Sequence, residues 1–155
     1  MMHVLRSLEP LQMKPNVMIV EELEEFSEVL FFMTGSYQVG YSINREYRFP
    51  IRYGGCREIG AYGVSFNKRS NFAFKTFERC TGFFALKILW LKVLMEPDNE
   101  IMVKIFKKRI NEDYIKNIKT RLLECKEFEL RKLSSRADID NVLSLQSVKK
   151  EKVSA

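Results

Sequence analysis

Histidine is almost absent from this sequence of 155 residues, which contains only His3. A catalytic triad or metal centre built on imidazole is therefore not expected. Cysteine is also scarce, and Cys56, Cys80 and Cys125 show no C-x-x-C spacing, as is typical of reduced thiols in the cytosol. No metal-ligand cluster or isolated carboxylate pair stands out either, so we expect a protein that is not an enzyme and needs no cofactor.

Long apolar runs are missing as well. The longest, Phe83–Met95, is interrupted by Lys87 and Lys92 and is too short to span a bilayer. No signal peptide is visible. We therefore expect a cytoplasmic chain without a membrane anchor of its own.

Charge is distributed unevenly along the chain. Residues 1–98 carry 12 basic and 11 acidic side chains, whereas residues 99–155 carry 14 basic and 9 acidic ones. A basic helix can meet acidic lipid, nucleic acid or an acidic partner, although a solvated helix face explains the same charges. The segment 137–145 is too short to supply a helix-turn-helix with its recognition helix, so no nucleic-acid partner is expected.

Short apolar segments separated by turn residues predict a mainly β structure after a short helix over 1–8. The turn signals include Gly35 and the pair Asn44-Arg45, and Pro50 indicates an edge strand. This spacing is typical of a sandwich or roll. The eight predicted strands are 11–13, 17–20, 28–32, 37–43, 47–51, 56–59, 72–76 and 81–86.

Helical periodicity replaces the strand pattern after residue 86. A helix around Trp90 is expected to stop at Pro97, and a long amphipathic stripe covers 101–133. A last short helix is predicted over 138–145, and 147–155 has the composition of a frayed tail. We divide the chain into a first domain, 1–122, and a basic helical extension, 123–155.

The stretch 59–70 contains the most distinctive local pattern. Gly60 and Gly63 stand three apart, a short run with helical character follows, and Lys68-Arg69-Ser70 opens the next strand. Such a loop can present backbone N–H groups and a cation to an anion. A tight connection between strands explains the two glycines equally well.

Together these segments resemble a cyclic-nucleotide-binding domain over about 1–122. Residues 31–39, FFMTGSYQV, look like the family hairpin Y-F-I-x-x-G-x-V-x-V, and 59–64, IGAYGV, look like its phosphate-cassette motif. The sequence of residues 59–76 is most similar to that of the cytoplasmic tails of voltage-gated potassium channels of the cyclic-nucleotide-gated, hyperpolarisation-activated and ether-à-go-go type. The resemblance implies an α+β, mainly β fold: an eight-stranded antiparallel, jelly-roll-like β-roll with a short N-terminal helix, a short phosphate-cassette helix and two or more C-terminal helices.

The resemblance also implies where a cyclic nucleotide, cyclic AMP or cyclic GMP, would bind. Cassette amides and the Arg69 guanidinium would hold the phosphate, whereas the family's ribose-binding Glu is replaced here by Ala61. Glu58 fills that role only in a shifted register, and an Ala61→Glu substitution would distinguish the two alternatives. The candidate ligand-binding residues are Glu58, Gly60, Ala61, Tyr62, Gly63, Val64, Arg69 and Ser70.

Two features argue for the fold more strongly than for ligand binding. The spacing from Ala61 to Arg69 is shorter than in nucleotide-binding members of the family, and Tyr62 and Phe66 are bulky for a cassette that admits a nucleotide. The lid helix, 102–122, is an alternative occupant of the empty roll. We expect a non-catalytic regulatory module like that of a potassium channel tail, near the cytosolic face of a membrane, with a degenerate nucleotide site. The alternative is a stand-alone scaffold or assembly protein that binds a protein partner, or itself, through the C-terminal amphipathic helix.

Overall fold

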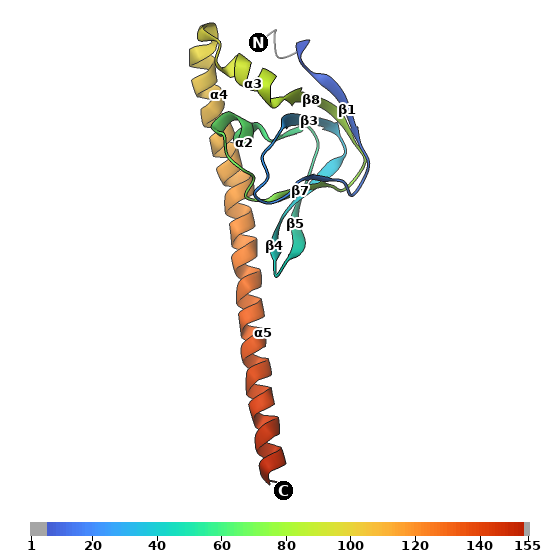
Figure 1. Ribbon diagram of the computed structural model, residues 1–155, viewed down its shortest axis with the longest axis vertical. Helices are drawn as coiled ribbons and strands as arrows, with labels where there is room; N and C mark the ends of the chain where they lie inside the picture. The colour runs from blue at the N-terminus through green and yellow to red at the C-terminus, as the bar shows by residue number, and fades with distance from the viewer. Residues whose placement is uncertain (1–5, 154–155) are drawn as a thin grey trace. The chain divides into compact units, whose positions relative to one another are not determined.

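The computed structural model describes the backbone of residues 6–153 and the side chains of residues 6–145. The chain forms two compact units, Met1–Leu122 and Leu123–Ala155. Within the described part of the first unit, eight strands form two four-stranded antiparallel sheets (Figure 1). This arrangement confirms the predicted β-roll. The helix predicted over 1–8 lies mostly outside the described residues.

The two sheets take their strands from distant parts of the sequence. In the first sheet the order is β1-β8-β3-β6, with β1 Glu9–Met13, β8 Cys80–Leu86, β3 Glu28–Thr34 and β6 Arg57–Ile59. In the second sheet the order is β2-β7-β4-β5, with β2 Met18–Val20, β7 Ala73–Thr76, β4 Ser36–Ile43 and β5 Glu46–Gly54. Each predicted strand overlaps one of these eight.

The predicted turns are present where β3, β4 and β5 follow one another. Gly35 joins β3 to β4 with a φ of 91°, and a Cβ there would lie 2.4 Å from the carbonyl oxygen of Arg79. Asn44 and Arg45 both have positive φ and close the hairpin between β4 and β5. Pro50 lies on β5, an edge strand, as its missing N–H group predicts.

Alternation along β3 directs its side chains into two separate apolar clusters. Phe32 faces the interior of the roll, where its ring centroid lies 5.9 Å from that of Tyr37 in the opposite sheet. Val29 points to the other side and joins a buried cluster formed with the helices α2 Ala61–Phe66, α3 Lys87–Leu94 and α4 Glu100–Asp113. The strand is therefore covered on both faces, which explains its nearly continuous apolar sequence.

The C-terminal helices follow the prediction up to about residue 137 and depart from it afterwards. α3 ends before Pro97, a short 3₁₀ turn η1 Pro97–Asn99 follows, and α4 passes through the π-helical segment η2 Tyr114–Lys119 into α5 Thr120–Val153. Residues 138–145 are helical as predicted, but they belong to the same helix as the preceding residues, and helical backbone replaces the predicted tail from residue 147 to Val153. Residues 154–155 of that predicted tail lie outside the described residues. No glycine or proline occurs after Pro97, so the sequence contains no residue that would end the helix.

The second unit consists of the helical residues that follow Leu122. Several large apolar side chains between residues 123 and 145 are exposed, and they include Phe128, Ile139 and Leu145, with 59%, 58% and 65% of their surface accessible. Across the described part of the chain, no helix combines the length and the apolar character needed to cross a membrane.

Candidate functional site

The loop predicted to hold an anion connects β6 to β7 and contains the six-residue helix α2. Gly60 precedes this helix with a φ of 95°, a left-handed conformation that glycine adopts without strain. Asn67 ends it with a φ of 50°. The short cassette helix that the resemblance implied is present, but it begins at Ala61 and contains Gly63, whereas the sequence pattern placed the helical run after both glycines.

Both glycines of the loop make room for the ring of Phe26. A Cβ on Gly60 would lie 2.9 Å from Cδ1 of this ring, and a Cβ on Gly63 would lie 2.6 Å from Cδ2. The same ring packs edge-on against Phe74 of β7, with 5.9 Å between the centroids. The glycine pair therefore has a packing role. Sequence analysis missed Phe26 because it follows an acidic turn and belongs to no periodic pattern.

A carboxylate of the protein itself binds the start of α2. The backbone N–H of Ala61 donates a hydrogen bond to Oε2 of Glu58, at 3.0 Å. Burial raises the pKa of the Glu58 carboxyl, the Ala61 hydrogen bond acts against this effect, and the neighbouring Asp113 carboxylate adds to it. An amide that the resemblance assigned to a bound phosphate is thus engaged by Glu58.

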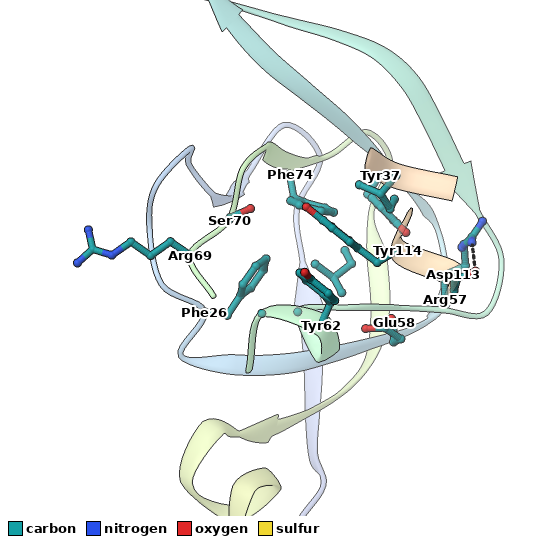
Figure 2. A pocket seen from close by; sticks show the side chains of 14 residues that line it. Phe26, Tyr37, Arg57, Glu58, Tyr62, Arg69, Ser70, Phe74, Asp113 and Tyr114 are labelled. Carbon is teal, nitrogen blue, oxygen red and sulfur yellow. Dashed lines mark ion pairs between the residues drawn. The ribbon is translucent and has the colours of Figure 1, made fainter. Parts of the chain in front are cut away.

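The lid segment places an aromatic ring directly on the cassette helix. The rings of Tyr62 and Tyr114 stack with 3.8 Å between centroids and an angle of 6° (Figure 2). Asn71 Nδ2 donates to the Tyr114 hydroxyl at 3.4 Å, and burial raises the pKa of this hydroxyl. The phenol of Tyr114 therefore occupies space above the cassette.

Hydrogen bonds and an ion pair also connect the lid, residues 102–122, to the strands β5 and β6 of the roll. The Tyr53 hydroxyl donates a short hydrogen bond to the carbonyl oxygen of Asn117 and accepts one from Nη1 of Arg121 at 3.0 Å. Arg57 of β6 forms an ion pair with Asp113 of α4, at 3.5 Å. Ile118 and Leu122 are buried. The lid helix thus packs onto the roll, as the sequence suggested for an empty cradle.

The cavity left between the lid and the roll is small. Its volume is about 40 Å³, which holds a few water molecules at most. Sites for small-molecule ligands typically measure about 300–1,000 Å³. In Figure 2 the rings of Phe26, Tyr62, Phe74 and Tyr114 converge on this space. A cavity of this size is too small to hold a cyclic nucleotide.

The resemblance implied that Arg69 and Ser70 lie at a bound phosphate, and the structure directs their side chains to different partners. The Arg69 side chain points away from the aromatic rings that surround the cavity (Figure 2). It is 67% exposed and forms an ion pair with Glu25 at 3.7 Å. Ser70 is buried, and its hydroxyl donates to the carbonyl oxygen of Phe72 at 2.6 Å. Both residues border the cavity, but the guanidinium is directed outward.

The other predicted residues divide between the cavity and the core. Glu58, Gly60, Tyr62 and Gly63 border the cavity. The side chains of Ala61 and Val64 are instead buried in the cluster around Trp90, each with 1% of its surface exposed. The N–H of Val64 donates to the carbonyl oxygen of Gly60 at 2.9 Å, within the helix. The structure therefore brings together only part of the predicted ligand set.

Sequence analysis did not identify the residues that close the cradle. Tyr114 was visible only as one member of a long apolar stripe, and neither Arg57 nor Asp113 belongs to a recognisable motif. Among the described side chains, those of residues 6–145, no group of three or more His, Cys, Asp or Glu residues is placed to hold a metal ion.

Comparison with known proteins defines the fold class of this chain. No family model matches it, and no curated protein matches it at the level of sequence. Among solved structures, the regulatory domain of Toxoplasma gondii PKA with cAMP matches 57% of this chain with a TM-score of 0.53 and 11% identity. A cAMP-binding acyltransferase from Mycobacterium smegmatis matches 61% with a TM-score of 0.51 and 14% identity.

A third structure, the cAMP-bound form of the EAL enzyme Bd1971, matches 81% of this chain with a TM-score of 0.52 and 12% identity. The matched regions span 34%, 30% and 34% of the Toxoplasma, Mycobacterium and Bd1971 chains, respectively. At these identities the likeness establishes the fold alone. The first unit has the β-roll fold of cyclic-nucleotide-binding regulatory domains.

Proposed function

We propose that this chain is a non-catalytic regulatory module whose cyclic-nucleotide cradle is degenerate and is closed by its own lid. The observation that carries the proposal is the Tyr62–Tyr114 stack, which covers a cavity of about 40 Å³. The internal Glu58 contact at the start of α2 supports it, because a carboxylate there competes with a cyclic phosphate for the same amide. The cAMP-bound structures with this fold support a cyclic nucleotide as the ligand class.

The regulatory step would be a change between two packings of the lid on the roll. An aromatic stack contributes about 0.5–1.5 kcal/mol beyond area burial, and a partly exposed ion pair such as Arg57–Asp113 about 0–1 kcal/mol. These two contacts sum to about 0.5–2.5 kcal/mol, and the burial of the Tyr114 ring adds to that sum, so opening the lid costs on the order of 3 kcal/mol. A ligand that binds only the open form loses on the order of 10²-fold in apparent affinity.

The sequence motifs carry a finer proposal, in which this module belongs to the cytoplasmic tail of a potassium channel. In that setting the continuous helical backbone from α4 through η2 would transmit the lid position along the chain. Patch recording of a channel that carries this unit, with and without cyclic nucleotide on the cytosolic side, tests this finer proposal. A current that does not change when Tyr114→Ala is introduced would contradict it.

Calorimetry with cyclic AMP and cyclic GMP tests the closed cradle directly. We expect no measurable heat for the unmodified chain at about 0.1 mM ligand, and measurable binding for Tyr114→Ala because the substitution removes the occupant of the cradle. Tyr47→Ala is a matched control, since Tyr47 is an exposed ring on β5 that stacks on Phe49. Micromolar binding by the unmodified chain would show that the cradle is not closed.

The alternative function, a scaffold that docks through its C-terminal helix, is favoured by a different observation. Large apolar side chains between residues 123 and 145 are exposed, and exposed apolar surface of this kind marks interaction sites. Light scattering of the purified chain, together with a pull-down, tests this alternative. An ordered monomer that captures no partner would count against it.

A further inference from the structure

The closed cradle is rich in aromatic rings. The described residues around its cavity include five aromatic side chains, those of Phe26, Tyr37, Tyr62, Phe74 and Tyr114. The ring centroids of Phe26 and Phe74 lie 5.9 Å apart, and those of Tyr37 and Phe74 lie 6.3 Å apart. A ring attracts a cation that lies within about 6 Å of its centroid, so a cation in this small cavity is within reach of several rings at once.

The charged groups around the cavity do not suit an anion. The described lining residues carry two guanidinium groups and two carboxylates. The Arg69 guanidinium is directed outward and pairs with Glu25 (Figure 2). The Arg57 guanidinium pairs with Asp113, and its Cζ lies 4.3 Å from the ring centroid of Tyr53. Both guanidinium groups are therefore already matched with a carboxylate.

Glu58 adds a carboxylate that has no such match. Its Oε2 accepts the hydrogen bond from the N–H of Ala61 at 3.0 Å, and among the described residues no Lys or Arg forms an ion pair with it. Figure 2 shows this carboxylate on the side of the cavity where Tyr62 lies. Burial raises the pKa of the Glu58 carboxyl, and a cation beside it would favour the ionised form. Aromatic rings grouped around a cavity are the arrangement that recognises methylated ammonium groups.

We propose that the closed cradle binds a small methylated ammonium ion, with the aromatic rings around its methyl groups and its N–H group donating to the Glu58 carboxylate. This inference rests on the closed cradle of the proposed function, and it assigns to that cradle a ligand whose charge is opposite to that of a cyclic nucleotide. The cavity of about 40 Å³ has room for about three water molecules at roughly 10–15 Å³ each. Trimethylammonium, with four non-hydrogen atoms, is close to this size. Its N–H group would form a charge-assisted hydrogen bond, which is stronger than one between neutral groups.

Proton NMR tests the cation site with trimethylammonium as the probe and 2-propanol as the control, because the two have the same number of non-hydrogen atoms and differ in charge. We expect the unmodified chain to bind trimethylammonium with a Kd of about 1–10 mM, a weak affinity in keeping with so small a ligand, and about 10-fold or more tighter than 2-propanol. The methyl signal of the probe should move upfield, since protons above the face of an aromatic ring are shielded. Equal affinities for the two probes would overturn the proposal. Binding without an upfield shift would do the same, because it would place the ion on an exposed carboxylate.

A pair of charge variants tests the role of the carboxylate. Glu58→Gln keeps an oxygen that can accept the Ala61 hydrogen bond and removes the negative charge, so trimethylammonium should bind about 5-fold or more weakly. Glu112→Gln is the matched control, because it removes an exposed carboxylate of the lid that pairs with Lys108, and it should leave the affinity unchanged. Circular dichroism verifies that both variants fold. The same affinity for both folded variants would contradict the proposal.

Cyclic AMP, added as a third ligand, separates this inference from the proposed function. If the unmodified chain binds neither trimethylammonium nor cyclic AMP, the cation site is wrong and the closed cradle stands. Micromolar binding of cyclic AMP by the unmodified chain would overturn the closed cradle and, with it, the cation site.

Discussion

Tyr62 and Tyr114 form a nearly parallel pair, with ring centroids 3.8 Å apart and 6° between the ring planes. One ring belongs to the cassette helix α2 and the other to η2, the segment that follows α4. The pair therefore joins the helix that follows Gly60 to the lid, two segments that lie far apart in the sequence.

Replacing Tyr114 by Ala should destabilise the first unit by about 2 kcal/mol, because the change removes a half-buried ring and the stacking of that ring on Tyr62. Tyr114→Phe should lose far less, since it keeps the stack and gives up only the contact with Asn71. Urea denaturation followed by circular dichroism measures both changes. Equal losses for the two variants would assign the stability to the hydroxyl and not to the stack.

Gly63→Ala should lower the free energy of unfolding by roughly 1–3 kcal/mol, although alanine favours helix more than glycine does. The added methyl group would lie 2.6 Å from Cδ2 of Phe26. Phe26→Leu gives that methyl group more space, so the double variant should lose less than the sum of the two single variants. Thermal melting of the unmodified chain, the two single variants and the double variant completes the cycle. Strictly additive losses of stability would show that Gly63 does not serve to make room for the ring of Phe26.

Stability should depend on the charge of Glu58. Its pKa in the folded protein is raised above 4.5 by burial, so the folded state binds the proton more tightly than the unfolded state. This contribution is fully present below pH 4.5 and is lost as the pH rises through the raised pKa. Unfolding by urea across pH 4–8 should therefore show Glu58→Gln gaining stability relative to the unmodified chain as the pH rises. Curves that stay parallel would contradict the raised pKa.

Ala61→Glu should destabilise the protein by about 3 kcal/mol or more and should not create a ribose site. The side chain of Ala61 is 1% exposed and packs in the cluster that contains Val64 and Trp90, where a carboxylate has no partner among the residues of that cluster. Thermal melting measures the loss, and calorimetry with cyclic AMP measures binding. A stable variant that binds cyclic AMP would contradict this expectation. It would support the alignment in which position 61 corresponds to the ribose-binding Glu of the family.

Arg69→Ala should leave the free energy of unfolding within about 0.5 kcal/mol, because the side chain is exposed and its ion pair with Glu25 is weak. In the Tyr114→Ala background it should change cyclic AMP affinity less than 3-fold if the guanidinium stays directed outward. Lys68→Ala, one residue earlier, is the control for loss of charge. A 10-fold loss specific to Arg69 would show that this side chain turns inward when ligand is present.

The order of the elements was readable from the sequence because local rules govern it. Gly35, the Asn44-Arg45 pair and Pro97 end or turn elements through their own backbone preferences, and the structure places a turn or a helix end at each. The end of the last helix was not readable. The charged and polar residues after residue 145 looked like a tail, yet without glycine or proline the backbone continues as helix to Val153.

The sequence by itself determined the eight strands and their turns, because side-chain periodicity and turn residues act over a few neighbouring positions. The roll and the short helix that follows Gly60 were predicted from the resemblance of the motifs to a known family. Only the tertiary structure decided the state of the cradle. It placed Tyr114 on Tyr62, the Glu58 carboxylate at the start of α2, and the Arg69 side chain toward solvent. The stack and the outward turn depend on packing between segments far apart in the chain, and even the local Glu58 contact depends on burial that the roll and lid create. No local pattern records those contacts.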